Sequence, residues 1–297
     1  MALVVLDPGL HSLVVGAGRP TTRHLGLPVG GAADRAALAL GNALVGNPPD
    51  TPALEITASG PTLRADRPTA AVIFGAPFLA AVANKSRLES GTTFTLEAGD
   101  TLKIGGTPSG VRAYLCVPGG FATQPHDPIQ VDDVLDCAES RRSGRSLPFV
   151  ALPGEPPDAP IRVVAGPQYD WFLDVGPFFA NEYRVSPASN RMGVRLSGEK
   201  LERRPGEMVS EAVAPGAIQI SNDGQPIVLG VDGQTIGGYP KLAHVIRADL
   251  DRLAQLRPGS AVRFRQVVND EAVRAWDSRS ATIREWLLRM SVAANLS

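Results

Sequence analysis

Residues 215–240, PGAIQISNDGQPIVLGVDGQTIGGYP, contain two short apolar runs, AIQI and PIVL, on either side of a turn rich in Asn, Asp and Gly. Short apolar runs bounded by such residues are typical of β-strands. The second run leads into DGQTIGGYPK, residues 232–241, which concentrates a side-chain amide, a hydroxyl, two adjacent glycines and a lysine. This stretch therefore predicts a β-rich fold with a polar loop between strands.

The same pattern continues along the whole chain. Its 297 residues include 31 Gly and 26 Pro, about a fifth of the total, whereas average usage is roughly 12%. In FTLEAGDTLKI, residues 94–104, apolar residues alternate on both sides of a turn at 98–100, which predicts a hairpin with one buried face. The predicted fold class is therefore mainly β. We expect strands at residues 12–15, 53–57, 70–74, 92–96, 101–104, 111–117, 161–165, 217–220, 226–231 and 261–267.

Helical patterns are few. Asp34 is a suitable N-cap for an apolar helical pattern at residues 35–45. A short helix is expected at 249–256, and a longer one at about 269–290, where aromatic and aliphatic residues recur at helical spacing. We expect these helices to lie at the periphery of the β structure.

The length of the chain corresponds to roughly two domains. Residues 138–158 are rich in Pro, Gly, Ser and Arg and lack periodicity, as is typical of a domain boundary. We therefore predict domains at 1–145 and 160–297. LEAGDTLKI (96–104) and LRPGSAVRFRQV (256–267) share a faint similarity across this boundary, which favours two similar barrels or sandwiches over one large sheet.

Composition excludes several functional classes. The formal net charge is −1 and basic residues are scattered, so nothing indicates binding to nucleic acid or to an anionic membrane. Apolar runs fall well short of the roughly 20 residues that a membrane span needs, and the N-terminus has no basic leader, so a cytoplasmic protein is expected. Cys116 and Cys137 are interpreted as buried thiols, because two cysteines make no disulfide framework.

Common catalytic motifs are missing. The sequence contains no phosphate-binding loop and no G-x-S-x-G motif, so the chain is not expected to handle ATP alone. The histidines lack the spacing of metal ligands, and we predict no metal site. The four histidines are His11, His24, His126 and His244.

Polar side chains that do not titrate near neutral pH gather instead in glycine-rich turns of the second half. Asn190 and Arg191 stand in SPASNRMGVRLSG, residues 186–198, where a turn would present both side chains. Amide, guanidinium and backbone N–H groups suit a neutral amide, a ureido group or a carboxylate, and Gly237-Gly238 allows close backbone approach. The predicted substrate-binding residues are Asn190, Arg191, Gln219, Gln234, Thr235, Gly237, Gly238, Tyr239 and Lys241, and Glu211 lies in the same stretch.

A structural interpretation of these residues stays open at this point. The glycines also suit tight strand turns, and Arg191 also suits a surface position. Lys241 is equally compatible with neutralising a ligand carboxylate and with a solvent-facing turn. The sequence names no catalytic residue.

Several segments, taken in order, resemble the biotin-dependent carboxyltransferase family that includes urea carboxylase carboxyltransferase domains and allophanate hydrolase subunit 2. Free-standing bacterial members of this family include the C subunit of 5-oxoprolinase. The segments cover most of the chain. They are PGLHSLVV (8–15), GRPTTRHLGLPVGGAADRAALALGNALVGNPPDTPALEITASGPTL (18–63), LEAGDTLKIG (96–105), SNRMGVRLSG (189–198), residues 215–240, and HVIRADLDRLAQLRPGSAVRF (244–264).

The resemblance implies two cyclophilin-like β-barrel domains. It also implies a component of an ATP-dependent complex that processes an amide or lactam, or a carboxyltransferase acting on a urea-like amide. ATP or carboxybiotin would come through partner chains, because this chain has neither a nucleotide loop nor an Ala-Met-Lys-Met carrier motif. The expected partners resemble the B subunit of 5-oxoprolinase and its A subunit, a lactam-utilisation protein. An enzyme component is the favoured interpretation, and a non-catalytic regulatory component, an antagonist of a kinase inhibitor, is the alternative.

The first half departs from the family pattern. Val15-Gly16 stands where members usually have a Gln-Asp pair, and Pro77 stands where an acidic residue is common. The usual Gly-Ser-Arg-Ser-Thr loop is absent after Gly119-Gly120. These departures indicate either a different substrate or a scaffold that has lost catalysis.

Overall fold

The protein is described here by a computed structural model that covers residues 2–83, 87–122, 127–140, 144–147, 155–156, 158–206 and 208–295, with side chains to residue 291. His126 and much of the predicted linker at 138–158 lie outside these residues. The chain divides into two compact units that are discontinuous in sequence. Unit 1 comprises Met1–Ala17, Asp34–Pro153 and Thr282–Ser297, and unit 2 comprises Gly18–Ala33 and Gly154–Ala281.

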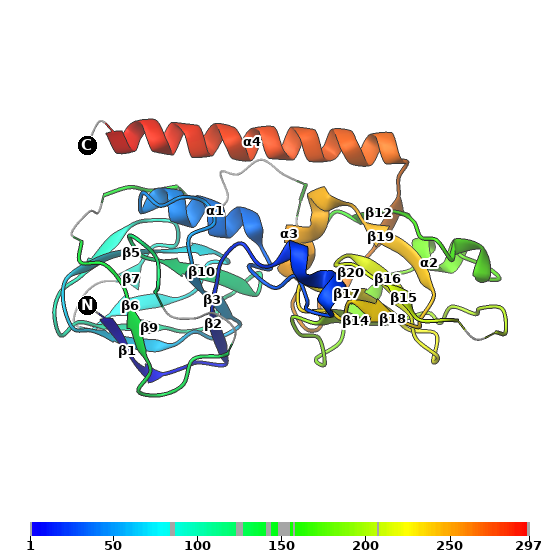
Figure 1. The fold of residues 1–297 in the computed structure, drawn as a ribbon, viewed down its shortest axis with the longest axis horizontal. Coiled ribbons are helices and arrows are strands. Elements are labelled where there is room, and N and C mark those ends of the chain that lie inside the picture. Colours follow the sequence, from blue (N-terminus) through cyan, green and yellow to red (C-terminus); the bar gives the residue numbers. More distant parts are fainter. Residues whose placement is uncertain are drawn as a thin grey trace. The chain divides into compact units, whose positions relative to one another are not determined.

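Unit 1 contains two antiparallel sheets formed by strands β1 to β11, most of which are labelled in Figure 1. Leu3 and Leu63 of one sheet and Leu54 and Leu115 of the other belong to the same buried cluster, so one core joins both sheets. The six-stranded sheet has the order β11 (Val134–Asp136), β1 (Ala2–Asp7), β4 (Thr62–Ala65), β9 (Thr101–Ile104), β6 (Ala80–Val82) and β7 (Arg87–Leu88). The five-stranded sheet has the order β2 (His11–Val15), β3 (Ala53–Thr57), β10 (Arg112–Cys116), β5 (Thr69–Gly75) and β8 (Phe94–Leu96).

The hairpin predicted at residues 94–104 is wrong. β8 pairs with β5 in one sheet, whereas β9 pairs with β4 and β6 in the other. The turn between β8 and β9 is held by Ala65, whose N–H donates to the Asp100 carbonyl at 2.9 Å and whose carbonyl accepts from the Gly99 N–H at 2.8 Å. Alternation indicates which face of a strand is buried but says nothing about its partner, so the pattern fits this corner as well as a hairpin.

The predicted first helix is confirmed as α1 (Arg35–Leu44). The Asp34 side chain accepts a hydrogen bond from the Ala37 N–H at 2.9 Å, as an N-cap does. The Tyr114 hydroxyl accepts from the Asp34 N–H and donates to Glu55, both at 2.8 Å. Burial, and next the nearby Glu55 charge, raise the pKa of Tyr114 well above its ordinary value. This buried polar chain fixes the start of α1 on the five-stranded sheet.

Unit 2 is built on an eight-stranded sheet that is nearly closed. Its two edge strands, β20 and β21, are consecutive in the chain and are separated only by Arg263, so the backbone itself connects the two edges. The predicted single strand at 261–267 is therefore two strands. The sheet has the order β20 (Ala261–Val262), β13 (Tyr183–Val185), β14 (Gly193–Ser197), β17 (Pro226–Leu229), β16 (Ala217–Ile220), β19 (Lys241–Val245), β12 (Ile161–Ala165) and β21 (Phe264–Gln266).

Two short strands stand apart from this sheet. β15 (Glu211–Ala212) and β18 (Ile236–Gly237) pair only with each other. We call them the β15–β18 ribbon. The loop singled out from the sequence, residues 232–241, supplies one of its strands.

Helices are few and short, apart from the last. The predicted short helix is α3 (Leu250–Ala254), preceded by the 3-10 turn η4 (Arg247–Asp249), and the predicted long helix is α4 (Asn269–Asn295). Helical elements that the sequence did not predict are α2 (Gly176–Ala180) and the 3-10 turns η1 (Pro20–Leu25) and η3 (Tyr169–Trp171). The strands that it did not predict include β4, β6, β7, β11, β13, β14, β15, β18 and β19. Aside from 261–267, the predicted strands correspond to single observed strands whose ends differ by at most two residues. The mainly β prediction is confirmed.

The part of the chain that the structure describes contains no helix both long and apolar enough to cross a membrane. Among the same residues there is also no cluster of three or more His, Cys, Asp and Glu side chains suited to a metal ion.

Candidate functional site

The core of the candidate site is a pair of cross-strand neighbours in unit 2. Gln219 of β16 lies opposite Lys241 of β19, where a register shift follows Ile218. Gln219 is 1% exposed and Lys241 is 3% exposed. Residues directly opposite each other on antiparallel strands project their side chains from the same face. The fold thus places a side-chain amide and an ammonium group together at the end of two central strands.

Lys241 is held by a network that reaches outside the sheet. Its ammonium forms an ion pair with the Glu211 carboxylate on the β15–β18 ribbon. Gln168 donates to the same carboxylate oxygen through Nε2 at 2.6 Å, and its Oε1 accepts from the backbone N–H of Lys241 at 3.1 Å. The hydrogen bond from Lys241 is the largest of the effects that lower the pKa of Glu211.

Gly237 is the point where two amide side chains meet. A Cβ atom built on Gly237 would lie 2.6 Å from Nε2 of both Gln219 and Gln234. The φ angle of Gly237 lies outside the left-handed region, so the requirement for glycine here is spatial. Gln219 also donates to the Tyr239 carbonyl at 3.4 Å. The two amides therefore flank the backbone of the ribbon.

The remaining loop residues hold the ribbon in place. The Thr235 carbonyl accepts from the Val213 N–H at 3.0 Å. A Cβ atom on Gly238 would lie 3.3 Å from the Ser210 hydroxyl, so the backbone at 238 also runs close to the segment before β15. The predicted residues Gln219, Gln234, Thr235, Gly237, Gly238, Tyr239 and Lys241 are therefore assembled in one region of unit 2.

Asn190 and Arg191 occupy the neighbouring turn between β13 and β14. Asn190 Oδ1 accepts from the Met192 N–H at 2.9 Å, which shapes the turn itself. Arg191 donates to both carboxylate oxygens of Asp232, at 2.6 and 3.1 Å, and to the Gly31 carbonyl at 2.7 Å. The contacts of Arg191 thus tie the segment 18–33 to the start of the loop. Ligand binding by Asn190 and Arg191 stays a prediction.

His244 extends the same strand. It lies three residues after Lys241 on β19 and is half-buried. Burial, and next the positive charge of Lys241, lower the pKa of His244 below its ordinary value. His244 is therefore a neutral neighbour of the cluster at neutral pH.

Sequence reasoning missed Gln168 and left Glu211 outside the predicted binding set. Gln168 follows β12 in the motif GPQYD, remote in sequence from the loop, and nothing local distinguishes it. The sequence position of Glu211 could have indicated that it belongs to the site, because it lies in the same glycine-rich stretch as Gln219. Their contacts depend on β12, β15 and β19 coming together, which only the three-dimensional structure shows.

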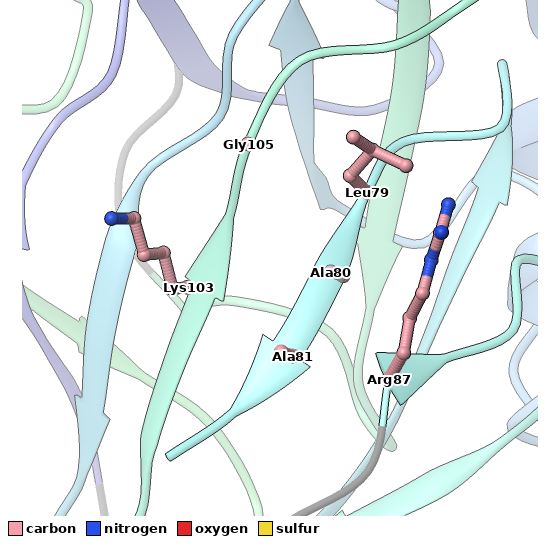
Figure 2. A pocket seen from close by; sticks show the side chains of 6 residues that line it. All are labelled: Leu79, Ala80, Ala81, Arg87, Lys103 and Gly105. Carbon is pink, nitrogen blue, oxygen red and sulfur yellow. The ribbon is translucent and has the colours of Figure 1, made fainter.

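Unit 1 offers a hollow of a different character. Figure 2 shows Lys103 and Arg87 on either side of the strand that carries Ala80 and Ala81. Leu79 and Gly105 complete the lining, which is aliphatic apart from the two basic side chains. It lacks the amide groups that an amide ligand requires, so the cluster in unit 2 is the better candidate.

The chain that carries this nearly closed β sheet and polar cluster is similar in sequence to carboxyltransferase domains. A family model described as carboxyltransferase domain, subdomain A and B, matches residues 25–127 and 124–266. The C subunit of 5-oxoprolinase from Haemophilus influenzae is 33% identical over 290 residues, which cover 91% of this chain and 93% of that protein. The chain therefore belongs to the carboxyltransferase domain A and B family, and within it is similar to the C subunit of 5-oxoprolinase.

Solved structures agree with this assignment. The chain matches the crystal structure of TTHA0988 with a TM-score of 0.80 and 34% identity over 89% of its length. It matches the K. lactis urea amidolyase with a TM-score of 0.84 and 26% identity over 96% of its length. It spans only 55% of the first solved chain and 20% of the second. The predicted fold class, with cyclophilin-like barrel domains and few helices, is confirmed.

Proposed function

We propose that this chain is one component of an ATP-dependent complex that opens a small lactam of the 5-oxoproline type. The observation that carries the proposal is the similarity to the C subunit of 5-oxoprolinase, which extends over about nine-tenths of both chains. The sequence lacks a phosphate-binding loop, so partners similar to the A and B subunits of 5-oxoprolinase supply the ATP chemistry. We place the complex in the cytoplasm.

The polar cluster of unit 2 supports an amide ligand. Gln219 and Gln234 each carry a donor and an acceptor, the complement of the N–H and C=O of a lactam. The Gln219 side chain is buried, and a buried amide whose position is set by its strand binds without losing much side-chain freedom. Groups held in this way orient an amide for attack and stabilise charge that develops on its oxygen.

The test is reconstitution of the complex. The chain is co-expressed with the A-type and B-type partner proteins of the same genome, and 5-oxoproline-dependent ATP hydrolysis is measured together with the ring-opened product, glutamate. We expect both activities to require all three chains, and Gln219→Ala to reduce both while the complex still assembles. Full activity of the other two chains without this one would contradict the proposal.

Urea provides the comparison substrate. If the chain instead serves a carboxyltransferase, activity will appear with urea and a biotinylated carrier protein and will be absent with 5-oxoproline. A complex that turns over neither substrate, although it assembles, would leave only a binding role for this chain.

A further inference from the structure

The two side chains of the Lys241–Glu211 ion pair differ in their exposure to solvent. The Lys241 side chain is 4% exposed, whereas the Glu211 side chain is 44% exposed. An ammonium group removed from water requires an anionic partner, because burial of an unpaired charge is very unfavourable. Here the partner reaches in from the exposed side of the cluster. The site on Lys241 is therefore one that an anion can enter from solvent.

The two partners also differ in how firmly the fold holds them. Lys241 lies on β19, which pairs with both β12 and β16 in the eight-stranded sheet. Glu211 lies on β15, a two-residue strand that pairs only with the two residues of β18. An isolated two-stranded ribbon has little stability of its own. Moving the Glu211 carboxylate away from Lys241 consequently disturbs less structure than moving Lys241.

The amide groups lie directly beside this anion site. Glu211 is the cross-strand partner of Gly237, against which both Gln219 and Gln234 lie. Gln219 is in turn the cross-strand partner of Lys241. A cationic group and two amide groups are thus contiguous. A small molecule that carries one carboxylate and one amide matches this set, whereas urea has no anionic group to pair with the cation.

We propose that Lys241 binds the carboxylate of the substrate and that Glu211 occupies this position in the ligand-free protein as an internal competitor, an inference that rests on the proposed function and specifies a lactam that bears a carboxylate. Ligand binding displaces the Glu211 carboxylate into solvent. Gln168, which contacts both partners, is a positioning residue that keeps the Lys241 backbone in place during the exchange.

The test compares two ligands on the isolated full-length chain by isothermal titration calorimetry. 5-Oxoproline carries the carboxylate, and 2-pyrrolidinone is the same lactam without it. We expect 5-oxoproline to bind roughly tenfold more tightly than 2-pyrrolidinone, or more, because a charge-assisted hydrogen bond to a carboxylate stabilises a complex by about that much. Lys241→Met should abolish this preference.

Glu211→Gln is the decisive variant, because it removes the competing charge and keeps the size of the side chain. We expect it to tighten binding of 5-oxoproline severalfold and to leave 2-pyrrolidinone unchanged. Glu271→Gln is the matched control, since Glu271 forms an exposed ion pair with Arg265 in the same unit, and it should change neither affinity. Unchanged or weaker binding of 5-oxoproline by Glu211→Gln would overturn the proposal, whether or not Lys241→Met folds.

Failure of this inference can be told apart from failure of the proposed function. If the complex opens 5-oxoproline but Glu211→Gln does not tighten its binding, the function stands and the inference fails. N-Acetylglycine, an acyclic amide with a carboxylate, covers the opposite case. If the complex is inactive on 5-oxoproline but Glu211→Gln tightens binding of N-acetylglycine, the carboxylate site stands and the lactam-opening function fails. If neither ligand binds wild type or Glu211→Gln, the inference is wrong.

Discussion

Gln168 connects the two partners of the Lys241–Glu211 ion pair, because it accepts from the backbone of Lys241 and donates to the carboxylate of Glu211. This arrangement joins the eight-stranded sheet to the β15–β18 ribbon through side chains. We therefore expect the hold on the ribbon to weaken when Glu211 loses its charge.

Glu211 should make the stability of the protein depend on pH at acidic values. The hydrogen bond from Lys241 lowers the pKa of Glu211, so the unfolded chain takes up this proton at a higher pH than the folded chain. The stabilisation is present above the unfolded-state pKa of about 4.3 and is lost as the pH falls through the lowered folded-state value. The free energies of unfolding of wild type and Glu211→Gln should converge as the pH is lowered, as measured by urea unfolding. A difference that stays constant with pH would contradict this, and Glu271→Gln serves as the control.

His244 should act in a higher pH range. Its pKa is lowered by burial and by Lys241, so the unfolded chain binds this proton where the folded chain does not. Stability should fall as the pH drops below about 6.5 and should continue to fall until the folded-state pKa is passed. In His244→Gln the urea midpoint should depend less on pH over this range. His24→Gln, at an exposed position, should leave the pH dependence of the midpoint unchanged. An unchanged profile in His244→Gln would show that other groups cause the pH dependence.

Arg191 should contribute to stability through its contacts with Asp232 and the Gly31 carbonyl. Arg191→Met leaves these acceptors without their donor, and Asp232 is one-third exposed, so we expect a loss of about 1–3 kcal/mol in the free energy of unfolding. Arg191→Lys should recover only part of it, because lysine cannot form the forked pair. Urea unfolding measures both variants. Unchanged stability combined with lost ligand binding would instead support the ligand role predicted from the sequence.

Gly237→Ala should displace the amides of Gln219 and Gln234, because the new Cβ would lie 2.6 Å from both nitrogens. Gln234 is exposed and free to move, whereas Gln219 is buried. We expect ligand affinity to fall about tenfold or more while overpacking costs about 1–3 kcal/mol of stability. Calorimetric titration and urea unfolding separate the two effects. Gly106→Ala, where a Cβ has room, is the control, and normal affinity in Gly237→Ala would remove these amides from the site.

Much of the fold was predictable because its signals are local. The Asp34 N-cap and the apolar pattern after it predicted α1, and alternating or continuous apolar runs predicted strands such as β9 and β16. The candidate site was predictable in part for the same reason. The loop at 232–241 carries its polar residues and glycines within ten positions, and the structure keeps most of them together.

The incorrect predictions concern which strands pair with each other and which side chains come into contact. The pattern at residues 94–104 indicated two strands correctly but assigned them to each other, and the strand predicted at 261–267 divides at Arg263 between opposite edges of one sheet. Gln168 carries no local signal of its contacts with Glu211 and Lys241. A hydrogen bond between residues 43 or 73 positions apart leaves no periodicity in the sequence.

By itself the sequence determined the β-rich class, the positions of three helices and many of the strands, and the amide-rich loop, because hydrophobic period, caps and turn residues act over a few neighbouring positions. Only the tertiary structure decided that Gly18–Ala33 belongs to unit 2, that the β20 and β21 edges meet around Arg263, and that Glu211 faces Lys241. These relationships depend on which backbone groups and charges find partners across the fold. The pairing of these groups is set by the fold of the whole chain, which must bury its core and at the same time give its buried polar groups hydrogen-bond partners.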